Sequence, residues 1–175
     1  MLRDHWKIAV VLAAQFAVLV AIPVRTLRTR ATGADVTLWT APIDPFDVMS
    51  GYYVTLAYEA ERPPEGRPAD RSPRERRDVW VTVRRGDPAW TPVSVTDERP
   101  DAAPDELSLR ARWNGWRTEI VNAGRLYIPE TQRQDVEAAL DAVRRRGLVD
   151  LRVSQDGDVA VIRLRADGKT FGEER

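Results

Sequence analysis

A long apolar segment lies near the N-terminus. Residues 8–24 contain one polar side chain, Gln15, and one proline, Pro23. At a rise of about 1.5 Å per residue, this segment reaches the lower limit of about 17 residues for a membrane-spanning helix. Trp6 would then lie at the level of the lipid headgroups. We therefore predict a single transmembrane helix over 8–24, preceded by a short tail over 1–7.

Two other interpretations of this segment are a cleaved signal peptide and a buried helix of a soluble domain. Cleavage is disfavoured because no small-x-small site precedes Arg25. A helix packed on one domain would show an apolar stripe, whereas this segment is apolar on every side. Basic residues flank both ends, so their count does not assign the orientation. A short tail before a large domain resembles a signal-anchor, and we expect that domain on the extracytoplasmic side.

The segment after the helix divides into a tether and a first strand. Residues 25–34 are predicted to be the tether, and residues 35–40 alternate polar and apolar side chains as a half-buried strand does. Pro42 and Pro45 each remove a backbone donor, so strand pairing should stop there and the chain should turn.

The turn leads into an aromatic strand. Asp44 and Asp47 can accept hydrogen bonds from backbone amides in such a turn, and Gly51 permits a sharp corner. Alternation then places a mainly apolar set of side chains on one face of the strand: Tyr52, Val54, Leu56 and Tyr58. The strand therefore has one heavily aromatic, apolar face.

A charged segment follows, over 61–77. It contains four prolines and no large apolar side chain. Because such a segment cannot bury enough surface to offset its ordering entropy, we predict a mobile loop. The loop is either a charged docking segment or an insertion on a hairpin, and the second is favoured because surface loops tolerate growth.

Further strands are predicted at 79–83, 90–95 and 107–113. Pro92 restricts its strand to an edge or a bulge. Asn114-Gly115 predicts a hairpin with a type I′ turn. Trp113 and Trp116 bracket this turn and form either a sugar-stacking platform or, as we favour, a cross-strand aromatic pair.

The C-terminal third combines one helix with two strands. Thr131 and Gln134 suggest a capping box, and an apolar stripe follows at helical spacing. Gly147 is expected to end the helix after three arginines, 144–146, which either form a solvated helix end or grip a phosphate or anionic lipid. Strands are predicted at 148–154 and 159–165, and residues 167–175 are expected to be a polar tail.

These elements predict an α+β fold made mainly of antiparallel strands. The domain over 35–166 is expected to form a sandwich or a distorted barrel with one packed helix, preceded by the single N-terminal transmembrane helix.

A family resemblance rests on two separate motifs. The first is the turn and aromatic strand, and the second is a tyrosine-centred strand over 125–130 that ends in Pro-Glu. Together they resemble the GDYXXLXY family of membrane-anchored bacterial proteins. The matching residues are Pro42, Asp44, Pro45, Gly51, Tyr53, Leu56, Tyr58, Tyr127, Pro129 and Glu130. The motif's aspartate is replaced by Tyr52, and a basic residue common in the turn is replaced by Phe46.

The resemblance implies a location and a partner, not a reaction. Members of the family are often encoded beside, or fused to, multi-pass membrane proteins. A membrane anchor and a multi-pass membrane partner are therefore expected for this chain as well.

Composition excludes several classes of function. The 27 basic and 27 acidic residues balance, so no overall field favours nucleic acid. The chain has no cysteine, which excludes thiol catalysis and zinc-thiolate sites. Its one histidine, His5, precedes the predicted membrane helix, which removes histidine triads from the domain. We expect no cofactor and no metal site.

Few residues suggest catalysis. Ser50 and Lys169 form the one serine and lysine pairing available in the domain, and no motif flanks either residue. Asp44, Asp47 and Glu130 could form an acid and base pair or a calcium site, although turn capping and surface exposure explain each more simply. Gly168-Lys169-Thr170 resembles the end of a phosphate loop but lacks its upstream glycine and its helix.

The predicted function is therefore a membrane-anchored envelope protein of the bacterial inner membrane. Its domain would act as a non-enzymatic binding or accessory module for a membrane-protein partner. The alternative is a membrane-bound hydrolase or carbohydrate-binding domain that uses the carboxylates and tryptophans.

Overall fold

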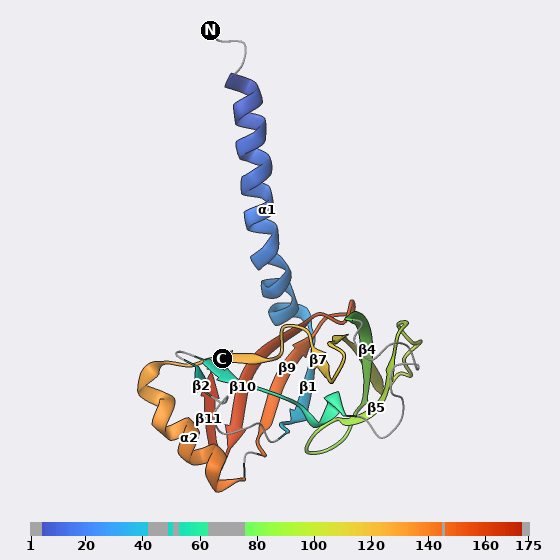
Figure 1. Cartoon of the computed structure of the whole chain (residues 1–175), viewed down its shortest axis with the longest axis vertical. Coiled ribbons are helices and arrows are strands. Elements are labelled where there is room, and N and C mark those ends of the chain that lie inside the picture. The colour runs from blue at the N-terminus through green and yellow to red at the C-terminus, as the bar shows by residue number, and fades with distance from the viewer. Residues whose placement is uncertain (1–4, 42–48, 51–52, 63–75, 145, 173–175) are drawn as a thin grey trace.

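The computed structural model describes residues 5–41, 49–50, 53–62, 76–144 and 146–172. Its first element is a long helix, α1 (His5–Thr32), which stands away from the β domain in Figure 1. The part Ala9–Thr32 is long and apolar enough to cross a membrane. Its single proline, Pro23, is tolerated inside the helix, as prolines often are in membrane helices.

The predicted tether over 25–34 is mostly helical. Between Arg25 and Thr32 the chain carries arginine, leucine and alanine, which favour helix, and no glycine or proline. α1 therefore continues to Thr32 and packs its last turns against the sheet. The helix and the domain are joined by one residue, Gly33, rather than by a flexible linker.

The junction at Gly33 is closely packed. A Cβ atom at this position would lie 2.5 Å from the backbone oxygen of Thr29 and 2.9 Å from the backbone nitrogen of Val153, so only glycine fits. Thr29 is buried. The guanidinium of Arg152 donates to the Gly33 carbonyl (2.7 Å) and forms an ion pair with Asp35 (3.1 Å). These contacts fix the direction of α1 relative to the sheet.

In the described residues, the β domain contains three antiparallel sheets. The sheet that carries α1 has the order β1-β9-β10-β11, with β1 (Ala34–Trp39), β9 (Leu148–Val153), β10 (Val159–Ala166) and β11 (Lys169–Gly172). A small sheet has the order β2-β3-β8, with β2 (Met49–Ser50), β3 (Tyr53–Thr55) and β8 (Arg125–Tyr127). The third has the order β5-β4-β6-β7, with β5 (Thr91–Thr96), β4 (Arg77–Arg84), β6 (Glu106–Trp113) and β7 (Thr118–Ile120).

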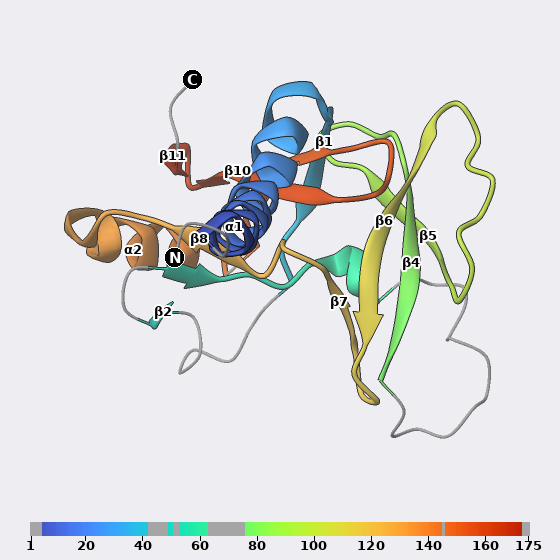
Figure 2. The same ribbon diagram turned by 90° about the horizontal axis from the view of Figure 1, so that it is seen from above.

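Two short 3₁₀ helices and one α-helix complete the domain. They are η1 (Glu59–Glu61), η2 (Glu130–Gln132) and α2 (Arg133–Ala142). Figure 2 looks down on α1 and shows it above the domain, between α2 on one side and the β5-β4-β6-β7 sheet on the other. The predicted class, α+β with mainly antiparallel strands and an N-terminal apolar helix, is confirmed.

The core is built from the inward-facing side chains of all three sheets. Valine and leucine dominate, as alternation along the strands requires. Tyr58 is the largest fully buried side chain, and its hydroxyl donates to the Ala123 carbonyl (2.8 Å). Burial raises the pKa of this hydroxyl well above its ordinary value, with a smaller contribution from the nearby Glu61. Tyr58 thus joins the aromatic strand to the chain that precedes β8.

Several local predictions are corrected by the structure. The predicted polar tail over 167–175 contributes β11, because the Asp167-Gly168 turn returns the chain along β10. α2 begins without a side-chain cap, so the capping box at Thr131 and Gln134 is wrong. The left-handed residue after α2 is Arg144 (φ 52°), not Gly147.

Gly147 has a different role. Its backbone N–H donates to Thr40 Oγ1 (2.7 Å), and its carbonyl accepts from the Thr40 backbone N–H (2.9 Å). A Cβ atom would lie 3.0 Å from the Arg165 carbonyl oxygen. Close approach of strands, not helix termination, therefore requires glycine here.

The prediction for Pro92 is confirmed. β5 is an edge strand of its sheet, and its pairing with β4 is irregular between Thr82 and Val83, where Val83 lies opposite Pro92.

Candidate binding cleft

The two predicted motifs lie side by side. β3 pairs with β8, and Tyr53 lies opposite Tyr127. Their ring centroids are 5.9 Å apart in an edge-to-face arrangement. The guanidinium of Arg125 lies 4.8 Å from the centre of the Tyr53 ring. Residues more than seventy positions apart in the chain therefore form one aromatic and basic surface.

The other motif residues differ in their surroundings. Leu56 is buried and donates its backbone N–H to the Gly124 carbonyl (2.9 Å). Pro129 and Glu130 are exposed at the start of η2. The turn residues Pro42, Asp44, Pro45, Asp47 and Gly51 lie outside the described residues, so their predicted roles remain predictions.

A cleft of about 1020 Å³ opens beside this surface. Its walls come from the foot of α1, the end of β3, and strands β7, β8 and β10. Thr26 and Arg30 contribute from α1, and Val159, Val161 and Ile162 contribute from β10. The cleft therefore lies where the apolar helix enters the domain.

The charged side chains that line the cleft are mostly basic. The basic side chains are Arg30, Arg112, Arg117 and Arg125, and the acidic side chains are Glu61 and Glu119. Arg117 forms an ion pair with Glu119 (2.7 Å), and Arg112 lies 3.5 Å from Asp78. The net positive charge favours an anionic occupant.

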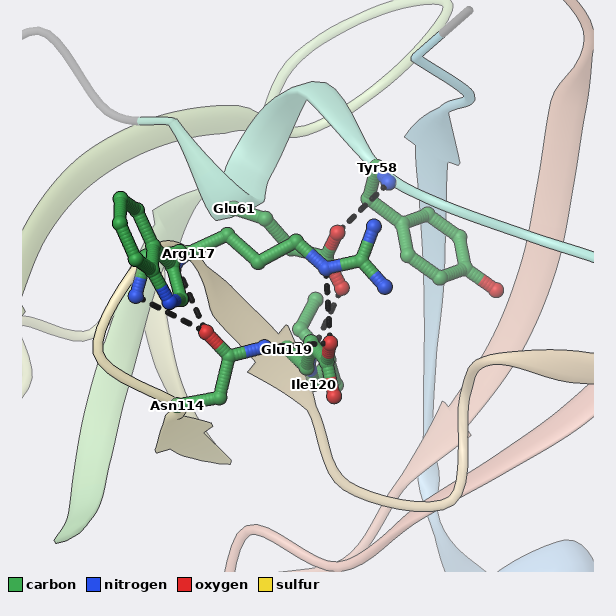
Figure 3. Close-up of polar contacts among 7 residues, drawn as sticks. Tyr58, Glu61, Asn114, Arg117, Glu119 and Ile120 are labelled. Atoms are coloured by element: carbon green, nitrogen blue, oxygen red, sulfur yellow. Dashed lines mark hydrogen bonds and ion pairs between the residues drawn. The ribbon is translucent and has the colours of Figure 1, made fainter. Parts of the chain in front are cut away.

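Glu61 is the least expected member of this set. The backbone N–H of Ile120 donates to its Oε1 (2.9 Å) and that of Tyr58 to its Oε2 (3.2 Å), as Figure 3 shows. This carboxyl therefore joins the end of the aromatic strand to β7.

The pKa of Glu61 is raised from 4.5 to about 7. Burial is the main cause; the two backbone hydrogen bonds and Arg117 lower the pKa, and Glu119 raises it. The cleft therefore contains a carboxyl group that changes between its protonated and ionised forms near neutral pH.

The predicted mobile loop over 61–77, which includes Glu61, is wrong at both ends. Glu61 belongs to η1, and Arg77 begins β4. The remaining loop residues, 63–75, lie outside the described residues. The signal that was missed is local: a glutamate three positions after Tyr58 can reach back to a backbone N–H.

The β6–β7 hairpin forms the outer rim of the site. The predicted hairpin is present, with Trp113 opposite Thr118, but its turn is not type I′. Gly115 has a positive φ (96°), whereas Asn114 does not. The Asn114 Oδ1 accepts hydrogen bonds from the backbone N–H groups of Trp116 and Arg117 (both 3.0 Å). The favoured cross-strand pair of tryptophans is therefore wrong, and Trp116 is 86% exposed.

The serine and lysine of the candidate pairing belong to different sheets. Lys169, in β11, forms an ion pair with Asp135 (3.0 Å), and the backbone of Ser50 lies in β2, opposite Tyr53. In the described part of the chain, no group of three or more acidic or histidine side chains could hold a metal ion.

Within the basic run 144–146, the Arg146 side chain already has partners in the domain and is not an open anion-binding site. Its guanidinium forms an ion pair with Glu59 (2.9 Å) and lies 4.6 Å from the centre of the Trp39 ring. Arg145 lies outside the described residues.

These features define a class: a β-rich domain carried on a candidate membrane-spanning helix, with a basic and aromatic cleft at the point of entry. The family model described as GDYXXLXY protein matches residues 15–164, which is most of the chain. The chain therefore belongs to the GDYXXLXY family, as the resemblance implied. No curated protein and no solved structure matches it.

Proposed function

We propose that this chain is a membrane-anchored binding module that receives part of a membrane-protein partner in the cleft at the foot of α1. The observation that carries the proposal is the position of the cleft. Its wall includes Thr26 and Arg30, which follow the apolar stretch of the same helix without a break.

The distance between the cleft and the bilayer can be derived from the helix. The apolar stretch ends at Val24, so Thr26 and Arg30 lie about 3 and 9 Å beyond it along the axis. The headgroup region of a bilayer is about 5–8 Å thick on each side. The cleft is thus reached most easily by a molecule that is itself at the membrane surface, which supports a membrane-protein partner.

The close-packed junction at Gly33 supports the same proposal. A flexible tether would allow the domain to tumble and to meet soluble partners in any orientation. The packed foot of α1 instead holds the cleft at one height and angle above the bilayer. A preorganised surface of this kind loses less entropy on binding a partner in the same membrane.

We further propose that the domain lies on the extracytoplasmic side of the bacterial inner membrane, as an envelope protein. A reporter enzyme that is active only outside the cytoplasm, fused after Arg175, tests it: activity is expected, and activity of a cytoplasm-specific reporter at the same position would contradict it.

Site-specific photocrosslinking tests the partner. A photoreactive residue in place of Tyr127, which is 69% exposed at the cleft, should crosslink one membrane protein in intact membranes. Ala138, exposed on α2, is the matched control position and should give no such product. Equal products at both positions, or none at Tyr127, would contradict the proposal.

A second candidate, a carbohydrate-binding domain, is supported by one observation. The indole of Trp116 is 86% exposed at a hairpin tip, where it could stack on a sugar ring. Tryptophan fluorescence with oligomers of N-acetylglucosamine as the probe tests this candidate. A change in wild type that disappears in Trp116→Ala would support it, and an unchanged signal in wild type would exclude these sugars.

A further inference from the structure

The first observation is that β8, whose residues line the cleft, is an edge strand. Among the residues that the structure describes, β3 is the one strand that pairs with β8. The Leu56 N–H donates to the Gly124 carbonyl, so this pair is hydrogen-bonded. Because hydrogen-bonded and non-hydrogen-bonded pairs alternate in an antiparallel ladder, the backbone groups of Arg125 and Tyr127 point away from β3.

The second observation is a matching edge on the opposite wall. The described part of β11 pairs with β10 between Arg163 and Ala166. Ser154 N–H donates to the Asp158 carbonyl (2.9 Å), so by the same alternation Val159 and Val161 point their backbone groups away from β9. Both valines line the cleft, and within the described residues no strand pairs with their outer side.

The third observation is the chemistry around these edges. Arg117 and Arg125 lie in the cleft, and their side chains are exposed. The rings of Tyr53 and Tyr127 form the surface from which Arg125 extends. Unpaired strand edges recruit extended peptides through main-chain hydrogen bonds, and neighbouring side chains select among them.

We propose that the segment received in the cleft is an extended, acidic peptide segment of the membrane-protein partner, which adds as a strand to the open edge of β8. The inference rests on the proposed function and names the chemistry of its ligand. Main-chain hydrogen bonds from Arg125 and Tyr127 hold the segment, and its Asp or Glu side chains face the arginines.

Amide hydrogen exchange of the full chain in zwitterionic nanodiscs tests strand addition. The probe is a synthetic peptide that alternates glutamate and valine, compared with its lysine and valine counterpart. The acidic peptide should slow exchange at Arg125 and Tyr127 at least about tenfold, because these N–H groups become hydrogen-bonded. No slowing at either amide, or equal slowing by both peptides, would overturn the proposal.

A charge variant isolates the contribution of the arginines. Arg125→Glu should weaken binding of the acidic peptide about tenfold, since one attraction is replaced by one repulsion. Arg133→Glu makes the same charge change on exposed α2 and should leave the affinity within about twofold. Equal effects of the two variants would mean that overall charge, and not the cleft, attracts the peptide.

Two outcomes separate this inference from the proposed function. If nanodiscs containing phosphatidylglycerol protect the same amides without any peptide, the cleft binds a lipid headgroup and the inference is wrong. If the photoreactive residue at position 127 captures a partner but the acidic peptide leaves β8 unprotected, the partner binds by another mode. The proposed function would then stand without strand addition.

Discussion

Two carboxyl groups in different parts of the domain respond to their surroundings in opposite ways. Asp150 lies in the sheet that carries α1 and accepts hydrogen bonds from Thr37 (2.8 Å), Arg163 (2.6 Å) and Arg165 (2.7 Å). Burial acts to raise its pKa, but these partners outweigh burial and lower it. Glu61 lies in the cleft wall, where two backbone N–H groups do not outweigh burial, and its pKa rises to about 7.

The difference shows how the two regions are built. The anchor sheet supplies an opposite charge for its acid from the neighbouring strand, so Asp150 stays ionised at neutral pH. The cleft wall holds its acid mainly through main-chain donors, so the charge of the cleft changes near neutrality. The ion pairs of Asp150 therefore stabilise the sheet that carries α1 at all pH values near neutrality. The charge of the cleft wall, by contrast, changes with pH in that range.

The largest expected effect is a pH dependence caused by Glu61. Its folded pKa of about 7 lies above its ordinary value of 4.5, so the folded chain binds more protons than the unfolded chain between these two values. Stability from this group is fully present below about pH 4.5 and is lost as pH rises through 7. Urea unfolding should show a gain of about 3 kcal/mol from about pH 8.5 to about pH 4.5.

Glu61→Gln should remove most of this gain, because glutamine does not titrate. Glu130→Gln changes an exposed glutamate in η2 and should retain the wild-type slope. Asp150 adds no slope in this range, because the stability it contributes is present above pH 3.8 and is lost only as pH falls through its lowered pKa. An unchanged slope in Glu61→Gln would contradict the assignment.

The next largest effect is expected at the junction with α1. Gly33→Ala places a methyl group 2.5 Å from the Thr29 carbonyl oxygen, so the helix foot or β9 must shift, at a cost of about 2–3 kcal/mol. Gly124→Ala meets no atom closer than 3.9 Å and should change the unfolding free energy by less than about 1 kcal/mol. Equal unfolding midpoints for the two variants would show that the junction is not tightly packed.

A somewhat smaller effect is expected for Asp150→Asn. The substitution removes the negative charge from two arginines whose side chains are about 41–42% exposed, so solvent screening limits the loss to about 2 kcal/mol. Asp167→Asn changes an exposed turn residue with a positive φ, which asparagine also adopts, and is the neutral control. Thermal unfolding at pH 7 compares the two variants. If Asp150→Asn left the unfolding temperature unchanged, the ion pairs of Asp150 would not stabilise the sheet, and the contrast between Asp150 and Glu61 would be lost.

The smallest effect on stability is expected at the hairpin tip. Trp116→Ala should change the unfolding free energy by less than about 0.5 kcal/mol, because the indole is 86% exposed. Trp90→Ala serves as the positive control outside this ranking: it removes a buried indole and should cost about 3–5 kcal/mol in the same denaturant titration. A large loss for Trp116→Ala would show that the tip is part of the core and not a free surface.

Local patterns allowed much of the fold to be predicted from the sequence. The apolar run over 8–24, the alternation over 35–40 and the position of Pro92 depend on rules that act within a few residues, and the structure agrees with each. The motif strands, which carry Tyr53, Leu56, Tyr58 and Tyr127, were also recognisable one by one. These features follow from the spacing of apolar side chains along the chain and from the backbone chemistry of proline and glycine.

Other features depend on which segments meet in space. The pairing of Tyr53 with Tyr127, the burial of Glu61 against Ile120 and the closeness of Gly33 to Val153 join positions that are distant in the chain. A glutamate beside a charged, proline-rich segment looks exposed from composition alone, and only its burial changes its pKa. The sequence determined the strands, the helix and the family. The tertiary structure alone decided the cleft, because a cleft is made of surfaces that the order of residues does not place side by side.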